Sequence, residues 1–98
     1  MMIGDVKDEE LKDVVTSCGL KCSHHALVRI KQRLAPVDVE VFQDNLTHAY
    51  KIYKSNKAKR KKKLRITRKG IITRNEYYVR IEGVTYIFSG DYLVSLYI

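Results

Sequence analysis

The stretch that decides the fold is Tyr77-Tyr-Val-Arg-Ile-Glu-Gly-Val-Thr-Tyr-Ile-Phe-Ser-Gly-Asp-Tyr-Leu-Val-Ser-Leu-Tyr-Ile98. β-Branched and aromatic residues crowd it, and Gly83 and Gly90 divide it into runs of strand length. Glycine is the residue that tight hairpin turns need where φ is positive. The pattern therefore predicts three consecutive antiparallel strands, over residues 77–81, 84–88 and 92–98.

Upstream of this stretch the strand pattern continues more weakly. Residues 64–68 end at Lys69-Gly70, and residues 71–74 come just before Asn75-Glu76. Both read as short strands that extend the meander. Residues 54–63 have no apolar side chain except Ala58, so we expect an exposed loop or a solvated hairpin tip there.

The first half of the chain has helical rather than strand periodicity. The apolar stripes are Leu11, Val14, Val15 and Cys18 in a first helix that Gly19 ends, Ala26, Leu27 and Ile30 in a second that Ser23 caps, and Val39, Phe42, Leu46 and Ala49 in a third that opens at Pro36. Residues 20–22 are long enough only for a brief edge strand. Helices first and strands afterwards predict an α+β domain, with N-terminal helices packed on one face of a C-terminal antiparallel β-sheet.

Charge is distributed unevenly along this single predicted domain. The 98 residues carry 19 Lys and Arg against 11 Asp and Glu, a formal net charge of +8. An acidic helix is expected over residues 1–19, ahead of a core over residues 20–98 with a basic segment at 51–69 that contains no acid. A basic domain favours a polyanionic partner, above all RNA. We expect phosphate contacts from Lys57, Lys59, Arg60, Lys61, Lys62, Lys63, Arg65 and Arg68.

Other classes are disfavoured by composition. No apolar run is long enough for a spanning helix, and the N-terminus has no signal-peptide pattern, so we expect a cytoplasmic protein without a membrane partner. Two cysteines are too few for a disulfide framework. The spacing of Cys18, Cys22, His24 and His25 is poor for zinc, so no metal is predicted.

The second helix has the most informative side chains. His25, Arg29 and Arg33 follow one another at i, i+4 and i+8, which places an imidazole and two fixed cations on one helical face. Such a face can hold a phosphate. Near a capped helix N-terminus the dipole disfavours imidazolium, so His25 is available as a neutral base. A helix whose histidine and arginines are merely solvated is the alternative.

The pattern Ser-x-His-Ala-x-x-Arg-x-x-x-Arg, carried by Ser23, His25, Ala26, Arg29 and Arg33, resembles a set of small RelE-like, BrnT-like bacterial and phage proteins. Asp38 in the following helix and Tyr97 in the last strand also match. A helix with similar residues occurs in the RegB-type phage endoribonucleases, although there the arginines are spaced one residue further apart.

The resemblance implies a RelE-like fold and a metal-independent endoribonuclease of the toxin or phage type, without a cofactor. In such a reaction the 2′-hydroxyl of RNA attacks the adjacent phosphate. His25 would take the 2′ proton, with its neighbour His24 as the alternative, and Arg29 and Arg33 would clamp the phosphate. His24, His48 and Tyr97 are candidates for the acid that protonates the leaving oxygen, and the family comparison favours Tyr97.

Two other functions stay open at this point. One is a non-catalytic, regulatory module that binds nucleic acid, and the other is a basic interaction module bound by an acidic, antitoxin-like protein. Free RNA and ribosome-associated RNA both stay open as the RNA partner. Five tyrosines are open to either core packing or base stacking, namely Tyr77, Tyr78, Tyr86, Tyr92 and Tyr97.

Overall fold

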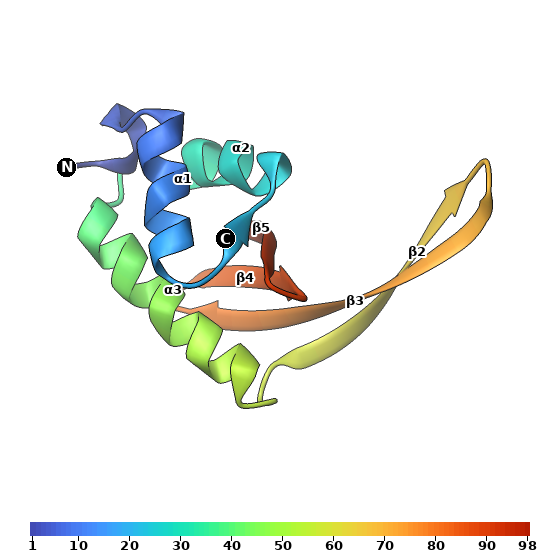
Figure 1. Cartoon of the computed structure of the whole chain (residues 1–98). Coiled ribbons are helices and arrows are strands. Elements are labelled where there is room, and N and C mark those ends of the chain that lie inside the picture. The colour runs from blue at the N-terminus through green and yellow to red at the C-terminus, as the bar shows by residue number, and fades with distance from the viewer.

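Three helices and five strands make up the fold (Figure 1). The computed structural model describes the backbone of residues 1–98 and all side chains except those at positions 62–63, 65–67 and 71–73. After a short 3-10 helix (Ile3–Asp5) the elements are α1 (Asp8–Ser17), β1 (Lys21–Cys22), α2 (His24–Arg33), α3 (Val39–Lys54), β2 (Lys59–Thr67), β3 (Gly70–Ile81), β4 (Val84–Ser89) and β5 (Tyr92–Tyr97). The α+β class predicted from the sequence is confirmed.

The strands form one mixed sheet in the order β1-β5-β4-β3-β2. Strands β2 to β5 are an antiparallel meander, and positive φ angles of 78° at Gly83 and 60° at Gly90 close its last two turns. The short edge strand β1 pairs with β5 in parallel. The sheet is therefore antiparallel as predicted except at this edge.

The helices begin where capping side chains are placed. Ser23 caps α2, because its Oγ accepts the N–H of Ala26 at 3.0 Å. The prediction that α3 opens at Pro36 is wrong: α3 begins at Val39, after Asp38, whose Oδ1 accepts the N–H of Glu40 at 2.9 Å. The side chain of an aspartate can accept a hydrogen bond from an N–H at the start of a helix, whereas the side chain of a proline cannot. The helix therefore starts after Asp38.

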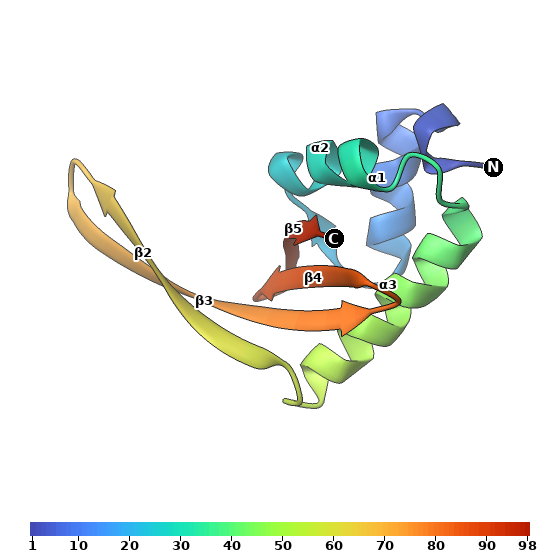
Figure 2. The same ribbon diagram turned by 180° about the vertical axis from the view of Figure 1, so that it is seen from behind.

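The hairpin of β2 and β3 is longer than the sequence pattern predicted. The basic run expected as a loop enters β2 at Lys59, and the two short strands expected around Asn75-Glu76 are one strand, β3. Residues Lys59 to Thr67 pair in register with Tyr78 to Gly70. Figures 1 and 2 show this hairpin extending away from the body as an arm. Strand β2 forms through this cross-strand pairing, since lysine has a weak intrinsic strand propensity.

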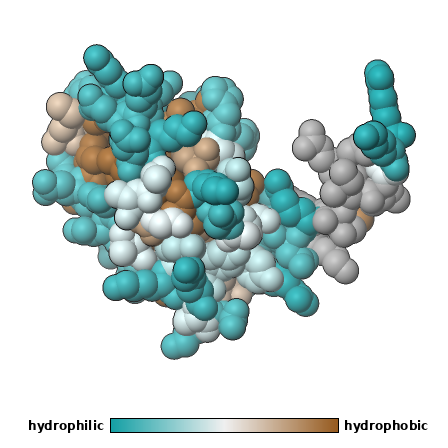
Figure 3. Space-filling view, in the orientation of Figure 1, coloured by the Kyte–Doolittle hydropathy of each residue, from teal (hydrophilic) through white to brown (hydrophobic). Residues whose placement is uncertain are grey.

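The helices cover one face of the sheet, here called the inner face. Tyr86, Phe88, Leu93 and Leu96 project from it into a core shared with all three helices, including Leu11, Ile30 and Phe42. In Figure 3 hydrophilic side chains cover most of the visible surface, with smaller apolar areas between them. The opposite, outer face of the sheet is left to the polar side chains that alternate with the core residues along each strand.

Candidate functional site

The outer face of the sheet gathers cations and tyrosines from three strands. Residues that are cross-strand partners project to the same face, so Lys59 lies beside Tyr78 and Lys61 beside Glu76. The described side chains of this face include those of Lys59, Lys61, Arg74, Glu76, Tyr78, Arg80, Thr85, Ile87, Ser89, Tyr92, Ser95 and Tyr97. These residues provide four cations and one carboxylate.

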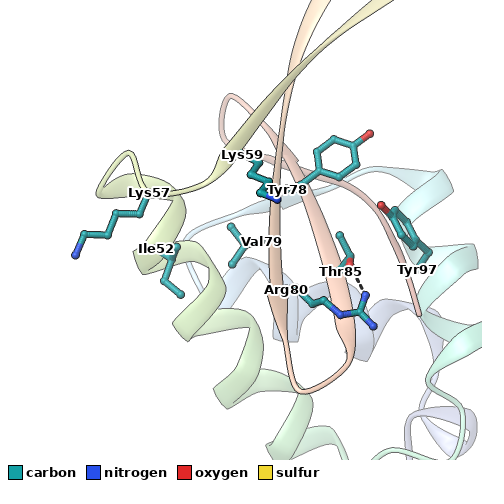
Figure 4. Close-up of a pocket in the computed structure, with 8 residues that line it drawn as sticks. All are labelled: Ile52, Lys57, Lys59, Tyr78, Val79, Arg80, Thr85 and Tyr97. Carbon is teal, nitrogen blue, oxygen red and sulfur yellow. Dashed lines mark hydrogen bonds between the residues drawn. The ribbon is translucent and has the colours of Figure 1, made fainter.

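A hollow of about 410 Å³, here called the outer pocket, lies where this face meets the end of α3 (Figure 4). Its lining is Ile52, Lys57, Lys59, Tyr78, Val79, Arg80, Thr85 and Tyr97. Figure 4 shows Val79 on the side of α3, whereas Tyr78, Arg80 and Tyr97 lie on the other side of β3. The outer pocket therefore combines three cations with two phenols.

The guanidinium of Arg80 is held within this pocket. Its Nη1 donates to Oγ1 of Thr85 at 2.8 Å, while Thr85 itself is 6% exposed. The bond fixes one nitrogen of a guanidinium that belongs to an exposed side chain lining the pocket. A guanidinium held in this way presents a planar set of N–H donors, and this geometry suits a phosphate.

Glu76 is the one acid among the outer-face side chains named above, and it is 5% exposed. Its carboxylate accepts a hydrogen bond from Nη2 of Arg74 at 2.7 Å and another from the hydroxyl of Tyr78 at 3.2 Å. Desolvation, and secondly the charge of Glu76, raises the pKa of Tyr78 above its usual value. Tyr78 is thus a neutral, oriented phenol at neutral pH, and the ammonium of Lys61 lies 5.8 Å from the centre of its ring.

Tyr97, predicted from the family comparison, lies in the outer pocket and is 38% exposed. Its ring meets that of Tyr78 edge to face, with centroids 6.4 Å apart. Within the described part of the chain no hydrogen bond engages its hydroxyl. That hydroxyl is available to a ligand as a proton donor.

The predicted face of α2 is formed in part. The Nε of Arg29 donates to Nε2 of His25 at 3.4 Å, and both side chains reach the surface. The contact places the imidazole and the first of the two guanidiniums side by side, as the i, i+4 spacing predicts. Arg33 lies one turn further along and is partly buried.

The start of α2 borders the outer face. Ser23, two residues before His25, donates to the carbonyl of Val94, three residues before Tyr97, at 2.9 Å. Ser23 also lines a hollow of about 290 Å³ together with Arg74, Ser89, Tyr92 and Val94. Among the described side chains no hydrogen bond or ring contact joins His25 to Tyr97 directly.

Ser23 therefore has two roles, and its removal tests how firmly α2 is attached. We expect Ser23→Ala to lower the free energy of unfolding by about 1–2 kcal/mol, since it loses a helix cap and a hydrogen bond to β5. Urea unfolding followed by circular dichroism measures the change. Ser23→Thr, which keeps the hydroxyl, is the control, and equal stability of the alanine variant and the wild type would contradict the capping role.

Two other predicted candidates lie apart from this geometry. His24 is exposed at the first residue of α2. His48 is exposed on α3, one turn before Ile52, and is not among the residues that line the outer pocket. Of the candidates for the acid, Tyr97 is the one the outer pocket contains.

The basic segment divides between the two faces. Lys57 and Lys59 line the outer pocket, Arg60 is paired with Tyr77 toward the inner side, and Arg68 is exposed in the turn between β2 and β3. The predicted contacts Lys62, Lys63 and Arg65 lie outside the side chains that the structure describes.

The tyrosines that the sequence left open between core packing and base stacking differ in exposure. Tyr86 is 1% exposed in the core, and desolvation raises its pKa to about 12. Tyr77 packs partly against the core, whereas Tyr92 is 43% exposed.

Sequence reasoning missed two residues of the outer face, Arg80 and Glu76. The signal was the alternation Arg74-x-Glu76-x-Tyr78-x-Arg80, which becomes visible once residues 70–81 are treated as one strand.

No helix in the described part of the chain is both long enough and apolar enough to cross a membrane. Among the described residues, no group of three or more His, Cys, Asp or Glu side chains is placed so that it could hold a metal ion. No protein-family model, no characterised protein and no solved structure matches this chain. The RelE-like resemblance stays a prediction, and the function is argued from the site itself.

Proposed function

We propose that the protein binds RNA across its outer face and cleaves it as a metal-independent endoribonuclease, as the RelE-like resemblance implies. The observation that carries the proposal is the outer pocket. There Lys59 and Arg80 line the same hollow as Tyr97, with Lys57 at its α3 end, on a sheet face bordered by the start of α2. Cations for a phosphate and a proton donor for a leaving oxygen are the groups that phosphodiester cleavage requires.

In the proposed reaction RNA supplies its own nucleophile. Arg29 turns from His25 to the scissile phosphate, which frees Nε2 of the imidazole to take the proton of the 2′-hydroxyl. The O2′ atom then bonds to phosphorus as the bond from phosphorus to O5′ breaks. Tyr97 donates its proton to O5′, and Arg80 stabilises the charge on the phosphorane oxygens. The products are a 2′,3′-cyclic phosphate and a free 5′-hydroxyl.

RNA rather than a protein partner is favoured by the kind of groups on the face. Arginine held by a neighbour and tyrosines with exposed edges suit phosphates and bases, and both come from one side of the sheet. An acidic protein would use the same cations but would leave the oriented phenols without a role.

We expect the wild type to cleave labelled single-stranded RNA in EDTA and to leave 2′,3′-cyclic phosphate ends. A matched oligonucleotide with 2′-O-methyl groups throughout is the control, since it keeps the phosphates but lacks the nucleophile, and we expect it to be bound but not cut. Binding of the unmodified RNA that weakens with salt, without cleavage at any pH, would overturn the enzyme and indicate a non-catalytic module.

A further inference from the structure

A second aromatic hollow lies on the inner side of the molecule, away from the outer pocket. It measures about 270 Å³ and is here called the tyrosine pocket. Its lining is Tyr50, Tyr53, Lys54, Asn56, Tyr77 and Gly90, drawn from the end of α3, from β3 and from the turn between β4 and β5. In Figure 3 side chains of intermediate hydropathy gather low on the visible face, around the C-terminal half of α3. The proposed cleavage reaction uses none of these residues.

The rings of this pocket are fixed without a ligand. Tyr53 stacks on Phe88 with centroids 5.0 Å apart and planes 4° from parallel, and its hydroxyl donates to the carbonyl of Gly90 at 2.9 Å. Tyr77 and Tyr50 flank it, with centroids 5.1 and 6.1 Å away and planes tilted by about 40°. A flat ligand would meet ring surfaces that are already ordered, which removes part of the entropic cost of binding.

Two cations lie close to these rings. The ammonium of Lys54 lies over the Tyr50 ring, 4.9 Å from its centre. Arg60 is exposed and is the cross-strand partner of Tyr77, so it projects toward the same side. The lining contains no carboxylate, and Asp91, next to Gly90, is ion-paired with Lys21 at 3.5 Å. The pocket thus offers stacking surfaces and positive charge together.

The two pockets adjoin the same piece of chain. Lys54 and Asn56 line the tyrosine pocket, and Lys57 and Lys59 line the outer pocket. The next residue, Arg60, points back toward the inner side. A strand of RNA that crosses residues 54–60 passes from one pocket to the other.

We propose that the tyrosine pocket binds one unpaired nucleobase of a single-stranded RNA by stacking on its tyrosines, with Lys54 and Arg60 on the adjacent phosphates. The inference rests on the proposed function and adds a substrate class to it. A base that is stacked in a duplex cannot enter the pocket, so the site selects single-stranded RNA over duplex RNA.

The test compares the binding of a 12-nucleotide oligouridine and a blunt 12-base-pair RNA duplex, both 2′-O-methylated so that neither is cut. We expect Lys54→Gln to weaken oligouridine binding several-fold and Tyr50→Leu to weaken it about tenfold, with duplex binding unchanged. Lys51→Gln, in the same last turn of α3 but outside the pocket, is the matched control. In a parallel experiment 5-iodouridine in the oligonucleotide is photo-crosslinked to the wild-type protein, and we expect the crosslink at Tyr50, Tyr53 or Tyr77.

Wild-type oligouridine affinity in Lys54→Gln together with crosslinks elsewhere would overturn the nucleobase site, even if Tyr50→Leu failed to fold. Cleavage of unmodified RNA that persisted under those results would leave the endoribonuclease proposal intact. Failure of the wild type to bind either RNA would instead overturn both proposals at once.

Discussion

Replacing Tyr97 by phenylalanine, or His25 by alanine, is expected to lower the rate of RNA cleavage by about 100-fold or more while the Kd for uncleavable RNA changes little. Each variant removes one proton-transfer group, and general acid–base catalysis contributes factors of this size. Tyr97→Phe keeps the ring that meets Tyr78, and His25 is exposed, so neither substitution disturbs the core. Single-turnover cleavage of a labelled oligonucleotide, with binding measured separately, gives both quantities.

Matched controls exist for each position. Tyr92→Phe removes the hydroxyl of another exposed tyrosine on β5, and His24→Ala removes the neighbouring exposed imidazole. Both controls are expected to cleave at the wild-type rate. If Tyr97→Phe cleaved as fast as Tyr92→Phe, Tyr97 would not be the acid, and if His24→Ala were the inactive variant, the base would be His24.

Phe42→Ala is expected to destabilise the fold by about 3–5 kcal/mol. Phe42 is fully buried where α3 meets the core, and the truncated side chain leaves a cavity that rigid neighbours fill only in part. For a domain of this size that is a large share of a total stability of about 5–15 kcal/mol. Chemical unfolding measures the difference.

The adjacent residue provides the control for this variant. Val41 is 51% exposed, so Val41→Ala is expected to change stability by less than about 0.5 kcal/mol. Equal losses in the two variants would contradict the orientation of α3. The pair also separates loss of cleavage through unfolding from loss of a site residue.

Local signals predicted most of the fold. Helical stripes such as Leu11 with Val15, the cap at Ser23 and the glycines at positions 83 and 90 act over a few residues, and the structure places helices, strands and turns accordingly. The start of β2 was missed because lysines have weak strand propensity, and Lys59 to Lys61 become a strand only by pairing with residues 76–78 far along the chain.

The candidate site was likewise predicted only in the part that depends on local spacing. The contact between His25 and Arg29 follows from helical spacing and was predicted. Lys57, Arg80 and Tyr97 line one pocket because of the sheet register and the position at which α3 ends. Their spacing along the chain does not predict this pocket. Arg80 was missed for this reason, whereas Tyr97 was named only through the family comparison.

The arm formed by β2 and β3 has a kinetic consequence. It contributes to a longest dimension of 43 Å in a molecule whose shortest is 22 Å, and it ends in a turn with exposed Arg68 and Lys69. Positive charge held out from the body enlarges the volume in which a passing polyanion is attracted, so it speeds the first encounter more than it prolongs the bound state. Salt should therefore slow association with RNA, with a smaller effect on its release.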